Sequence, residues 1–468
     1  MMFGNPYAAK NFCGAKNLVV CYEDDRYTQA AAIDKLKGTM PFVGKLPVTV
    51  CTDYAYGAGI NTEADKISYT NPDEVGLDPV KLSAIDSIAN TAITQGATPG
   101  CVVLVAKDGH IAFHKAYGYT DYSKTQAVNK NSIYDLASMT KMLSTTLAVM
   151  KLDEKGKLNL NKKLCDYLPE VKGTDKAKIK IKDLLLHQAG LQPFIPFQKY
   201  AMLPGGVQND MILQQYKKED FTTPVADELF VRNDFKDSIY HKIIASKMQD
   251  ATKYVYSDFD FIFLAKVVES IVGMPIDEYV RKQFYEPMEL KSLSFNPYTK
   301  IPLSKIVPSE NDTTFRKRVV HGYVNDPTAA LSGGVSGHAG LFGNAGDIAV
   351  VLQMLLNGGK FDHHTYLKRS TIALFTEYQS KISRRGYGFD KPEKDNATRS
   401  EPYPCASASP LTFGHTGFTG TCAWVDPEND LIYIFLSNRT YPNPENKKLL
   451  QLNIRPSIQE AIYQSIIK

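Results

Sequence analysis

The hydrophobic pattern contains short β-rich runs at two distant places in the chain. Four of these runs are expected to be strands: 101–106, 110–116, 419–425 and 431–437. The polar residues 107–109 and 426–430 separate the members of each pair, which is typical of two hairpins. The sequence therefore predicts strands near residue 100 and near the C-terminal end.

Helical spacing of apolar residues dominates most of what lies between these strands. Residues 79–93 carry leucine and isoleucine at helical intervals, residues 457–467 predict a closing amphipathic helix, and helical patterns with long loops extend to about residue 360. Strands come from both ends of this unit and helices from its middle. We therefore expect an α/β protein of the α+β type, in which an antiparallel sheet is flanked by helices and a helical subdomain is inserted.

The first fifty residues form a separate pattern. Residues 17–22 and 46–50 have strand character, and the alanine-rich stretch 28–36 predicts a helix. Such a piece is too small to hold a core of its own. Residues 52–75 are rich in Gly, Asn, Asp and Thr, which suits a linker. We expect a small α/β piece over 1–51, the linker, and the main unit over 76–468.

The composition argues against several classes of function. The net charge is +4, and Lys and Arg form no blocks, so nothing indicates nucleic acid as a partner. No apolar run reaches the roughly 18 residues that span a membrane, and the first residues do not have the pattern of a signal peptide. The seven cysteines are odd in number, with none at C-x-x-C spacing, so neither a zinc knuckle nor a disulfide framework is indicated. A single disulfide stays possible, and cysteine usage does not fix the compartment.

A serine and a lysine at S-x-x-K spacing provide the first candidate chemistry. Ser138 and Lys141 precede an apolar, helix-compatible stretch, so a helix starting near Ser138 makes them neighbours. A serine hydroxyl becomes a good nucleophile when a nearby group accepts its proton, and burial can lower a lysine pKa toward that task. The pattern alone is weak, because residues 465–468 also match it.

Two further motifs follow in order. Tyr256-Ser257-Asp258 precedes an apolar run, and His415-Thr416-Gly417 precedes the last two predicted strands. Together with Ser138 and Lys141, they resemble the Y-x-N and K-T-G or H-T-G motifs of the penicillin-recognising serine hydrolases, in the class C β-lactamase and esterase branch. Residues 184–191 and 333–342 resemble two more segments of that family, and the resemblance covers roughly residues 75–468. An α/β-hydrolase G-x-S-x-G, a zinc amidase motif and a P-loop are not found.

The resemblance implies a role for each motif residue. Ser138 is the expected nucleophile, Lys141 and Tyr256 handle its proton, and the backbone N–H groups of Ser138 and Phe418 receive the oxyanion. Asp258 replaces the usual Asn and can pair with Lys141, which shifts the role of base toward Tyr256.

The other motif residues are expected to have supporting roles. His415 replaces a lysine, which weakens the case for binding a β-lactam carboxylate, and Thr416 and Gly417 complete the motif. His187 and His338 are expected to be structural. No metal or cofactor is expected.

The N-terminal piece resembles part of the C-terminal domain of family 3 β-N-acetylhexosaminidases. The similar stretches are 3–7, 18–23 and 41–50, while the barrel that carries the glycosidase groups is absent. This resemblance suggests a remnant of, or a fusion to, a glycosidase, and a muropeptide as substrate. The hypothesis is cleavage of the N-acetylmuramoyl-L-alanine amide. The alternatives are a carboxylesterase or D-amino-acid peptidase, then a β-lactamase or a non-catalytic module.

Two further expectations concern the cleft and the compartment. Residues 192–252 are expected to shape the substrate cleft. A periplasmic or secreted location is favoured by the resemblance alone.

Overall fold

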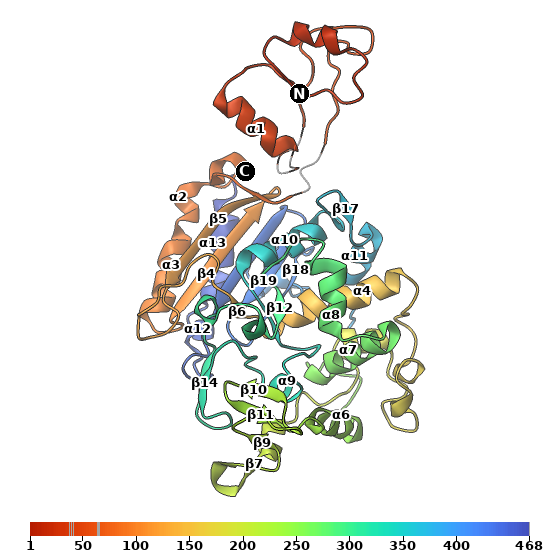
Figure 1. Ribbon diagram of the computed structural model, residues 1–468, viewed down its shortest axis with the longest axis vertical. Coiled ribbons are helices and arrows are strands. Elements are labelled where there is room, and N and C mark those ends of the chain that lie inside the picture. Colours follow the sequence, from red (N-terminus) through yellow and green to blue (C-terminus); the bar gives the residue numbers. More distant parts are fainter. Residues whose placement is uncertain (37, 39, 41, 63–65, 468) are drawn as a thin grey trace.

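A six-stranded sheet lies at the centre of the larger unit (Figure 1). The computed structural model describes residues 1–36, 38, 40, 42–62 and 66–467. The strands in sheet order are β18 (Phe413–Thr416), β19 (Cys422–Asp426), β20 (Leu431–Ser437), β4 (Gly100–Lys107), β5 (His110–Gly118) and β3 (Ser68–Tyr69). Neighbours are antiparallel except β3, which runs parallel to β5. The pairing of β20 with β4 joins the two distant groups of strands, which confirms the predicted sheet.

Helices cover both faces of this sheet. Along β4, Val102 and Leu104 belong to one hydrophobic core, whereas Val103 and Val105 belong to another, because successive side chains of a strand point to opposite faces. The first face packs against α10 (Ala345–Leu356). The second is covered by α2 (Pro79–Leu82), α3 (Ala84–Thr94), α12 (Lys448–Gln451) and α13 (Ile454–Ser465). The helix expected over 79–93 is thus divided at Ser83.

The middle of the chain forms the inserted helical subdomain beside the sheet (Figure 1). Its main helices are a π-helical turn (Lys141–Thr146), α4 (Leu147–Glu154), α5 (Ile181–Leu185), α6 (Phe235–Ala245), α7 (Asp258–Val272), α8 (Ile276–Val280) with a second π-helical turn (Arg281–Tyr285), α9 (Pro327–Leu331) and α11 (Arg369–Thr376). Nine of the fifteen residues of α7 are buried. This helix is apolar on most sides because it crosses the interior of the subdomain.

Short strands and 3-10 turns connect these helices. The strands are β6 (Tyr134–Asp135), β7 (Met202–Leu203), β8 (Val207–Gln208), β9 (Leu213–Gln214), β10 (Thr223–Ala226), β11 (Leu229–Val231), β12 (Ser294–Phe295), β13 (Glu310–Asp312), β14 (Arg318–Val320), β15 (Leu341–Gly343), β16 (Lys360–Phe361) and β17 (His364–Thr365). Strand β15 pairs with both β6 and β12. This pairing brings the glycine-rich segment before residue 342 next to the segment that precedes Ser138.

The N-terminal residues form a small unit that is separate from the main body in Figure 1. It contains β1 (Met2–Phe3), β2 (Val20–Cys21), which runs parallel to β1, and the predicted helix as α1 (Arg26–Leu36). The predicted strand over 46–50 is wrong. Leu46 and Val50 make only isolated backbone hydrogen bonds to residues 54–58, and Pro47 has no N–H with which to extend a ladder.

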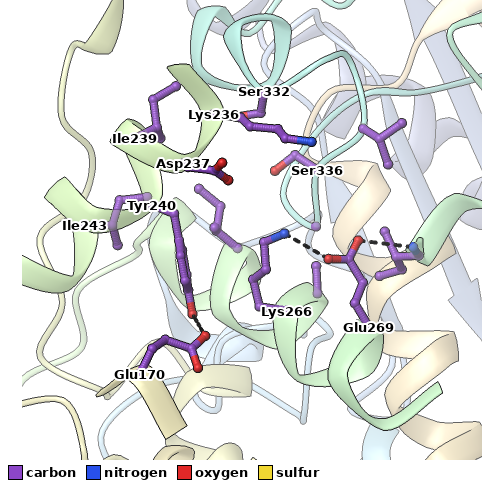
Figure 2. Close-up of a pocket in the computed structure, with 15 residues that line it drawn as sticks. Glu170, Lys236, Asp237, Ile239, Tyr240, Ile243, Lys266, Glu269, Ser332 and Ser336 are labelled. Atoms are coloured by element: carbon purple, nitrogen blue, oxygen red, sulfur yellow. Dashed lines mark hydrogen bonds and ion pairs between the residues drawn. The ribbon is translucent and has the colours of Figure 1, made fainter. Parts of the chain in front are cut away.

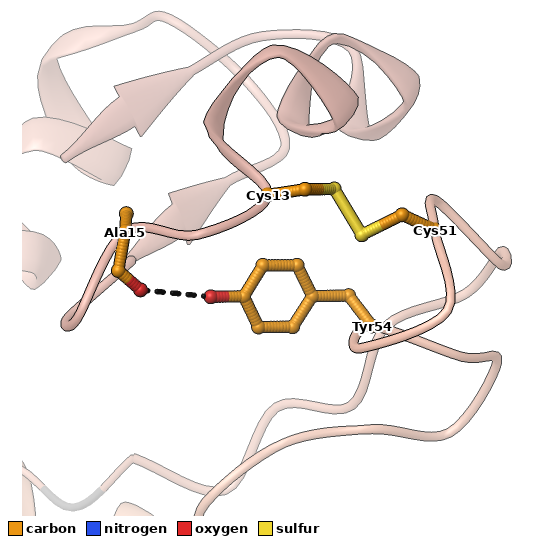
Figure 3. The surroundings of a disulfide bond; sticks show 4 residues. All are labelled: Cys13, Ala15, Cys51 and Tyr54. Atoms are coloured by element: carbon orange, nitrogen blue, oxygen red, sulfur yellow. Dashed lines mark hydrogen bonds between the residues drawn. A yellow bond between two sulfur atoms is a disulfide. The ribbon is translucent and has the colours of Figure 1, made fainter.

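A disulfide between Cys13 and Cys51 closes this unit (Figure 3). Tyr54 adds a hydrogen bond from its hydroxyl to the carbonyl of Ala15, at 3.1 Å. The sequence was compatible with a single disulfide but did not predict which two cysteines form it. The division of the chain at residues 51 and 75 stays a prediction, and β3 lies within the expected linker.

Candidate active site

Ser138 lies on a tightly held turn between β6 and the helix that begins at Met139. The preceding Ala137 has a φ of +46°, in the left-handed region that residues other than glycine rarely adopt. The buried Asp135 carboxylate accepts hydrogen bonds from the N–H groups of Ala137 (2.8 Å) and Asn325 (2.6 Å). These contacts hold the turn in a strained conformation, and they leave Ser138 only half-buried, so a substrate can reach its hydroxyl.

Lys141 is fully buried one helical turn after the serine. Its Nζ donates to Ser138 Oγ (2.9 Å), to Asp258 Oδ1 (2.8 Å) and to the carbonyl of His338 (3.2 Å). Burial disfavours the charge, but the Asp258 carboxylate and the Tyr256 phenol favour it more strongly, so the pKa of Lys141 lies above its ordinary value. The structure therefore brings Asp258 and Lys141 together as an ion pair, and the resting lysine is an ammonium.

Tyr256 faces the same ammonium from the segment that leads into α7. Its ring centre lies 5.0 Å from Lys141 Nζ and 6.2 Å from the ring centre of His415. The structure thus brings Tyr256 to the serine and the lysine from a separate segment of the chain. The proximity of the phenol is also one of the causes of the raised pKa of Lys141.

A buried histidine packs against the Tyr256 ring and is itself bonded to a buried carboxyl group. The His187 ring centre lies 4.4 Å from that of Tyr256, and its Nδ1 lies 2.7 Å from Asp260 Oδ2. Burial lowers the pKa of His187 well below its usual value and raises the pKa of Asp260 well above its usual value, so the pair is neutral. A neutral Asp260 donates to Nδ1, and the backbone N–H of Ser257 donates to the same atom at 3.3 Å.

The sequence reasoning missed two of these residues. Asp260 interrupts the apolar stretch of α7, and Asp135 stands three residues before the predicted nucleophile. An acidic residue inside an otherwise apolar run is a signal that was available in both cases, because buried carboxyl groups need partners.

The H-T-G segment forms the end of β18 and the turn after it. His415 is buried, and burial together with the nearby Arg385 lowers its pKa to about 3, so its imidazole is neutral. Its Nδ1 lies 2.7 Å from the carbonyl of Thr416 and donates to it. A β-carbon at Gly417 would lie 2.6 Å from the carbonyl of Leu136, so only glycine allows this turn to pack against the Ser138 turn.

This packing leaves two backbone donors free on the two turns that meet at Gly417, one of which carries the predicted nucleophile. Within the described residues, the N–H groups of Ser138 and Phe418 have no hydrogen-bond acceptor. Phe418 as a residue is 56% exposed, and the Arg439 guanidinium lies 4.6 Å from its ring centre. The two free N–H groups are suited to an oxyanion, because such a site needs donors that are held in place before the reaction.

His338 holds Lys141 through its carbonyl, while its ring is fixed by other partners. Its Nδ1 lies 2.8 Å from Ser336 Oγ, and its Nε2 lies 3.0 Å from Asp326 Oδ1. Burial opposes ionisation of Asp326, but His338 and the nearby Lys141 lower the pKa of this carboxyl group to about 2. Side-chain atoms of Asp258, Asp326 and His338 lie within 4.8 Å of one another, a spacing compatible with a metal ion. The Lys141 ammonium already neutralises one of these carboxylates.

A large cavity adjoins the H-T-G strand on the side of α13. Its volume is about 980 Å³, and Thr416, Tyr403, Trp424 and Arg455 contribute to its walls. Arg455 donates from Nη1 to the carbonyl of Thr421 at 3.0 Å, in the turn that follows Gly417. The cavity therefore holds the Arg455 guanidinium next to the predicted active site, although its lining also includes Glu393, Glu401 and Glu460.

The match to a family model decides the family. The model for Beta-lactamase matches residues 85–454, which is most of the chain. This chain belongs to the beta-lactamase family. The region that matches contains Ser138, Lys141, Tyr256 and His415. The chain is thus a serine hydrolase of this family.

Relatives and solved structures agree with this assignment. A protein of Salmonella enteritidis PT4 named "Putative D-alanyl-D-alanine carboxypeptidase" is 33% identical over 431 residues, covering 86% of this chain and 93% of that protein. The hydrolase EstCE1 is similar in fold, with a TM-score of 0.59, 20% identity, and coverage of 82% of this chain and 99% of EstCE1. A class C beta lactamase from Rhodobacter sphaeroides has a TM-score of 0.57 at 17% identity, with 82% and 100% of the two chains covered. Among the described helices, none is both long and apolar enough to cross a membrane.

Proposed function

We propose that the chain is a serine carboxypeptidase that acts through an ester on Ser138 and releases a C-terminal D-amino acid. The observation that carries the proposal is the Lys141 ammonium, which bonds to Ser138 Oγ at 2.9 Å next to two free backbone donors. Nucleophile, charge and oxyanion donors then occupy one site, as acyl transfer requires.

The first half of the proposed mechanism forms the ester. Ser138 Oγ attacks the substrate carbonyl carbon, and the oxyanion accepts hydrogen bonds from the N–H groups of Ser138 and Phe418. A charged lysine cannot accept the serine proton, so the Tyr256 hydroxyl relays it. The Tyr256 oxygen accepts the serine proton as its own hydroxyl proton passes to the leaving amine and the C–N bond breaks, and Lys141 stabilises the negative charge that develops on that oxygen during the transfer. In the second half, water attacks the ester by the same route and frees Ser138.

The wall of the large cavity and the names of the relatives support the substrate class. A D-amino-acid leaving group carries a free carboxylate, and Arg455 provides a guanidinium beside Thr416 for it. The Thr421 carbonyl uses one of the five N–H donors of this guanidinium, so the others are left for a carboxylate. The neutral His415 adds no charge of its own, so Arg455 has the larger role in attracting an anion.

A second candidate is cleavage of the N-acetylmuramoyl-L-alanine amide of muropeptides. The resemblance of residues 1–51 to part of a hexosaminidase domain favours it, because removal of an N-acetylglucosamine unit exposes this amide. Both candidates use the same Ser138 ester and differ in which amine leaves.

Mass spectrometry on parallel reactions tests and separates the two candidates. The protein is incubated with an N-acyl peptide ending in D-Ala-D-Ala, with an N-acetylmuramyl-peptide and with a simple acyl ester, and the Ser138→Ala variant is the control. We expect release of D-alanine from the first substrate only. Release of the intact peptide from the second supports the amidase instead. Turnover of the ester alone would contradict both.

A further inference from the structure

A second cavity lies in the helical subdomain, away from the Ser138 hydroxyl (Figure 2). Its volume is about 310 Å³, which is near the lower end of the range for small-molecule sites. It is enclosed by α6, by α7 and by the glycine-rich loop 332–337. None of the motif residues of the active site lines it.

Two opposite charges in this cavity have no partner. Among the described residues, the Lys236 ammonium and the Asp237 carboxylate take part in no hydrogen bond or ion pair. Figure 2 shows both side chains directed toward the open centre of the pocket. The other charged groups are already satisfied: Lys266 pairs with Glu269 at 3.0 Å, and Glu170 accepts a hydrogen bond from Tyr240 at 2.8 Å.

Apart from Ser332 and Ser336, whose hydroxyls already have partners, most of the remaining wall is aliphatic. It is formed by Ile239, Ile243, Ile262, Ile276 and Val335. The four isoleucines are buried, so the apolar surface lies deep in the cavity, whereas Lys236 and Asp237 lie exposed at its mouth. The cavity therefore offers one cation and one anion above an apolar floor.

We propose that this cavity binds a free α-amino acid with an aliphatic side chain. Lys236 pairs with the carboxylate of the ligand, Asp237 pairs with its ammonium, and the isoleucines enclose the side chain. A fatty acid would leave Asp237 without a partner, and an alkylamine would leave Lys236 without one. Only a zwitterion of small size satisfies both charges, because they stand on consecutive residues of one helix.

The loop that forms one wall also leads to the active site. Gly337 accepts a hydrogen bond from Thr145 Oγ1 at 2.7 Å, and the next residue is His338, whose carbonyl accepts from Lys141. A bound amino acid thus lies against the loop that positions the catalytic ammonium. The binding site itself does not depend on the proposed function, because it is tested without any substrate.

Isothermal titration calorimetry of the full chain with four ligands of similar size and shape tests the proposal. The probes are L-leucine, D-leucine, leucinamide, which lacks the carboxylate, and 4-methylpentanoate, which lacks the amine. We expect at least one enantiomer of leucine to bind, and both truncated probes to bind about tenfold more weakly or worse, since each loses a charge-assisted pair. Absence of leucine binding up to about ten millimolar, or equal binding of a truncated probe, would overturn the proposal.

Two variants and a matched control assign the binding to this cavity. Lys236→Ala and Asp237→Ala are each expected to weaken leucine binding by about tenfold or more. Lys242→Ala removes a lysine from the same helix outside the cavity and is expected to bind leucine normally. Lys236 and Asp237 are both exposed, so the melting temperature of each variant without ligand should match that of the wild type. Unchanged binding in Lys236→Ala and Asp237→Ala would show that the ligand binds elsewhere and would refute the assignment.

Discussion

Replacing Asp258 with Asn tests whether the resting Lys141 is held as an ammonium by its ion pair. The two charged atoms lie 2.8 Å apart, with the lysine fully buried and the Asp258 side chain 28% exposed. At an effective dielectric constant of about 20, their attraction is about 6 kcal/mol. Loss of one partner of a buried pair costs about 3–5 kcal/mol, and the partial exposure of Asp258 favours the lower value.

This loss changes both the charge of Lys141 and the stability. About 3 kcal/mol corresponds to a shift of roughly a hundredfold in the protonation equilibrium of the lysine toward the neutral amine. The raised pKa of Lys141 means that the wild type has this stabilisation at neutral pH and loses it as the pH rises through that pKa. The Asp258→Asn variant lacks it at every pH, so its free energy of unfolding at pH 7 should fall by about 3 kcal/mol.

The rate of Ser138 labelling by a fluorophosphonate between pH 5 and 10 provides the assay. A neutral Lys141 can accept the serine proton itself, so the rise of the rate with pH should move to lower pH in Asp258→Asn. Asp210→Asn, an exposed site, is the control and should follow the wild type. An unchanged profile, with an unchanged free energy of unfolding, would refute the ion-pair argument.

Three further predictions concern other buried groups. Asp260→Asn should lower the free energy of unfolding by less than about 1.5 kcal/mol in urea titration, because a neutral pair with His187 tolerates an amide; a loss above 3 kcal/mol would indicate an ionised Asp260. Because the pKa of His415 is about 3 in the folded protein, the free energy of unfolding should fall by about 1.4 kcal/mol for each pH unit below about 6.5, where the unfolded chain takes up a proton and the folded chain does not. The His415→Asn variant should lack this slope when urea titrations at pH 6.5 and 4.5 are compared. The Cys13→Ser variant lacks the disulfide to Cys51, and its N-terminal unit should be less stable by about 4 kcal/mol. In calorimetry, the unfolding transition of the larger unit should stay unchanged. A shift of that transition would contradict the separation of the two units.

The sequence predicted those parts of the molecule that local patterns determine. The two hairpins follow from runs of β-branched residues, and both faces of the sheet are buried in agreement with the expected helices on each side. The three motifs were found because their residues stand within three positions of one another. Their meeting in space was predicted from a family resemblance, and the geometry agrees with it.

Long-range contacts explain most of what the pattern did not reveal. Lys141 and Asp258 are 117 residues apart, and Asp135 and Asn325 are 190 residues apart. Local periodicity contains no information on such pairs. The conformation of Ala137 was likewise unforeseen, because alanine has no intrinsic preference for a positive φ and is held there by its neighbours.

The cross-link in the N-terminal unit has a consequence for the response of the chain to mechanical load. Cys13 and Cys51 are separated by 38 residues, which would otherwise extend to about 130 Å when pulled. With the sulfur atoms joined, tension applied at residue 1 travels across the bond toward the hydrolase without stretching the intervening loop. An oxidised chain should therefore be a shorter and stiffer tether than a reduced one, with the enclosed segment released only when a reductant opens the link.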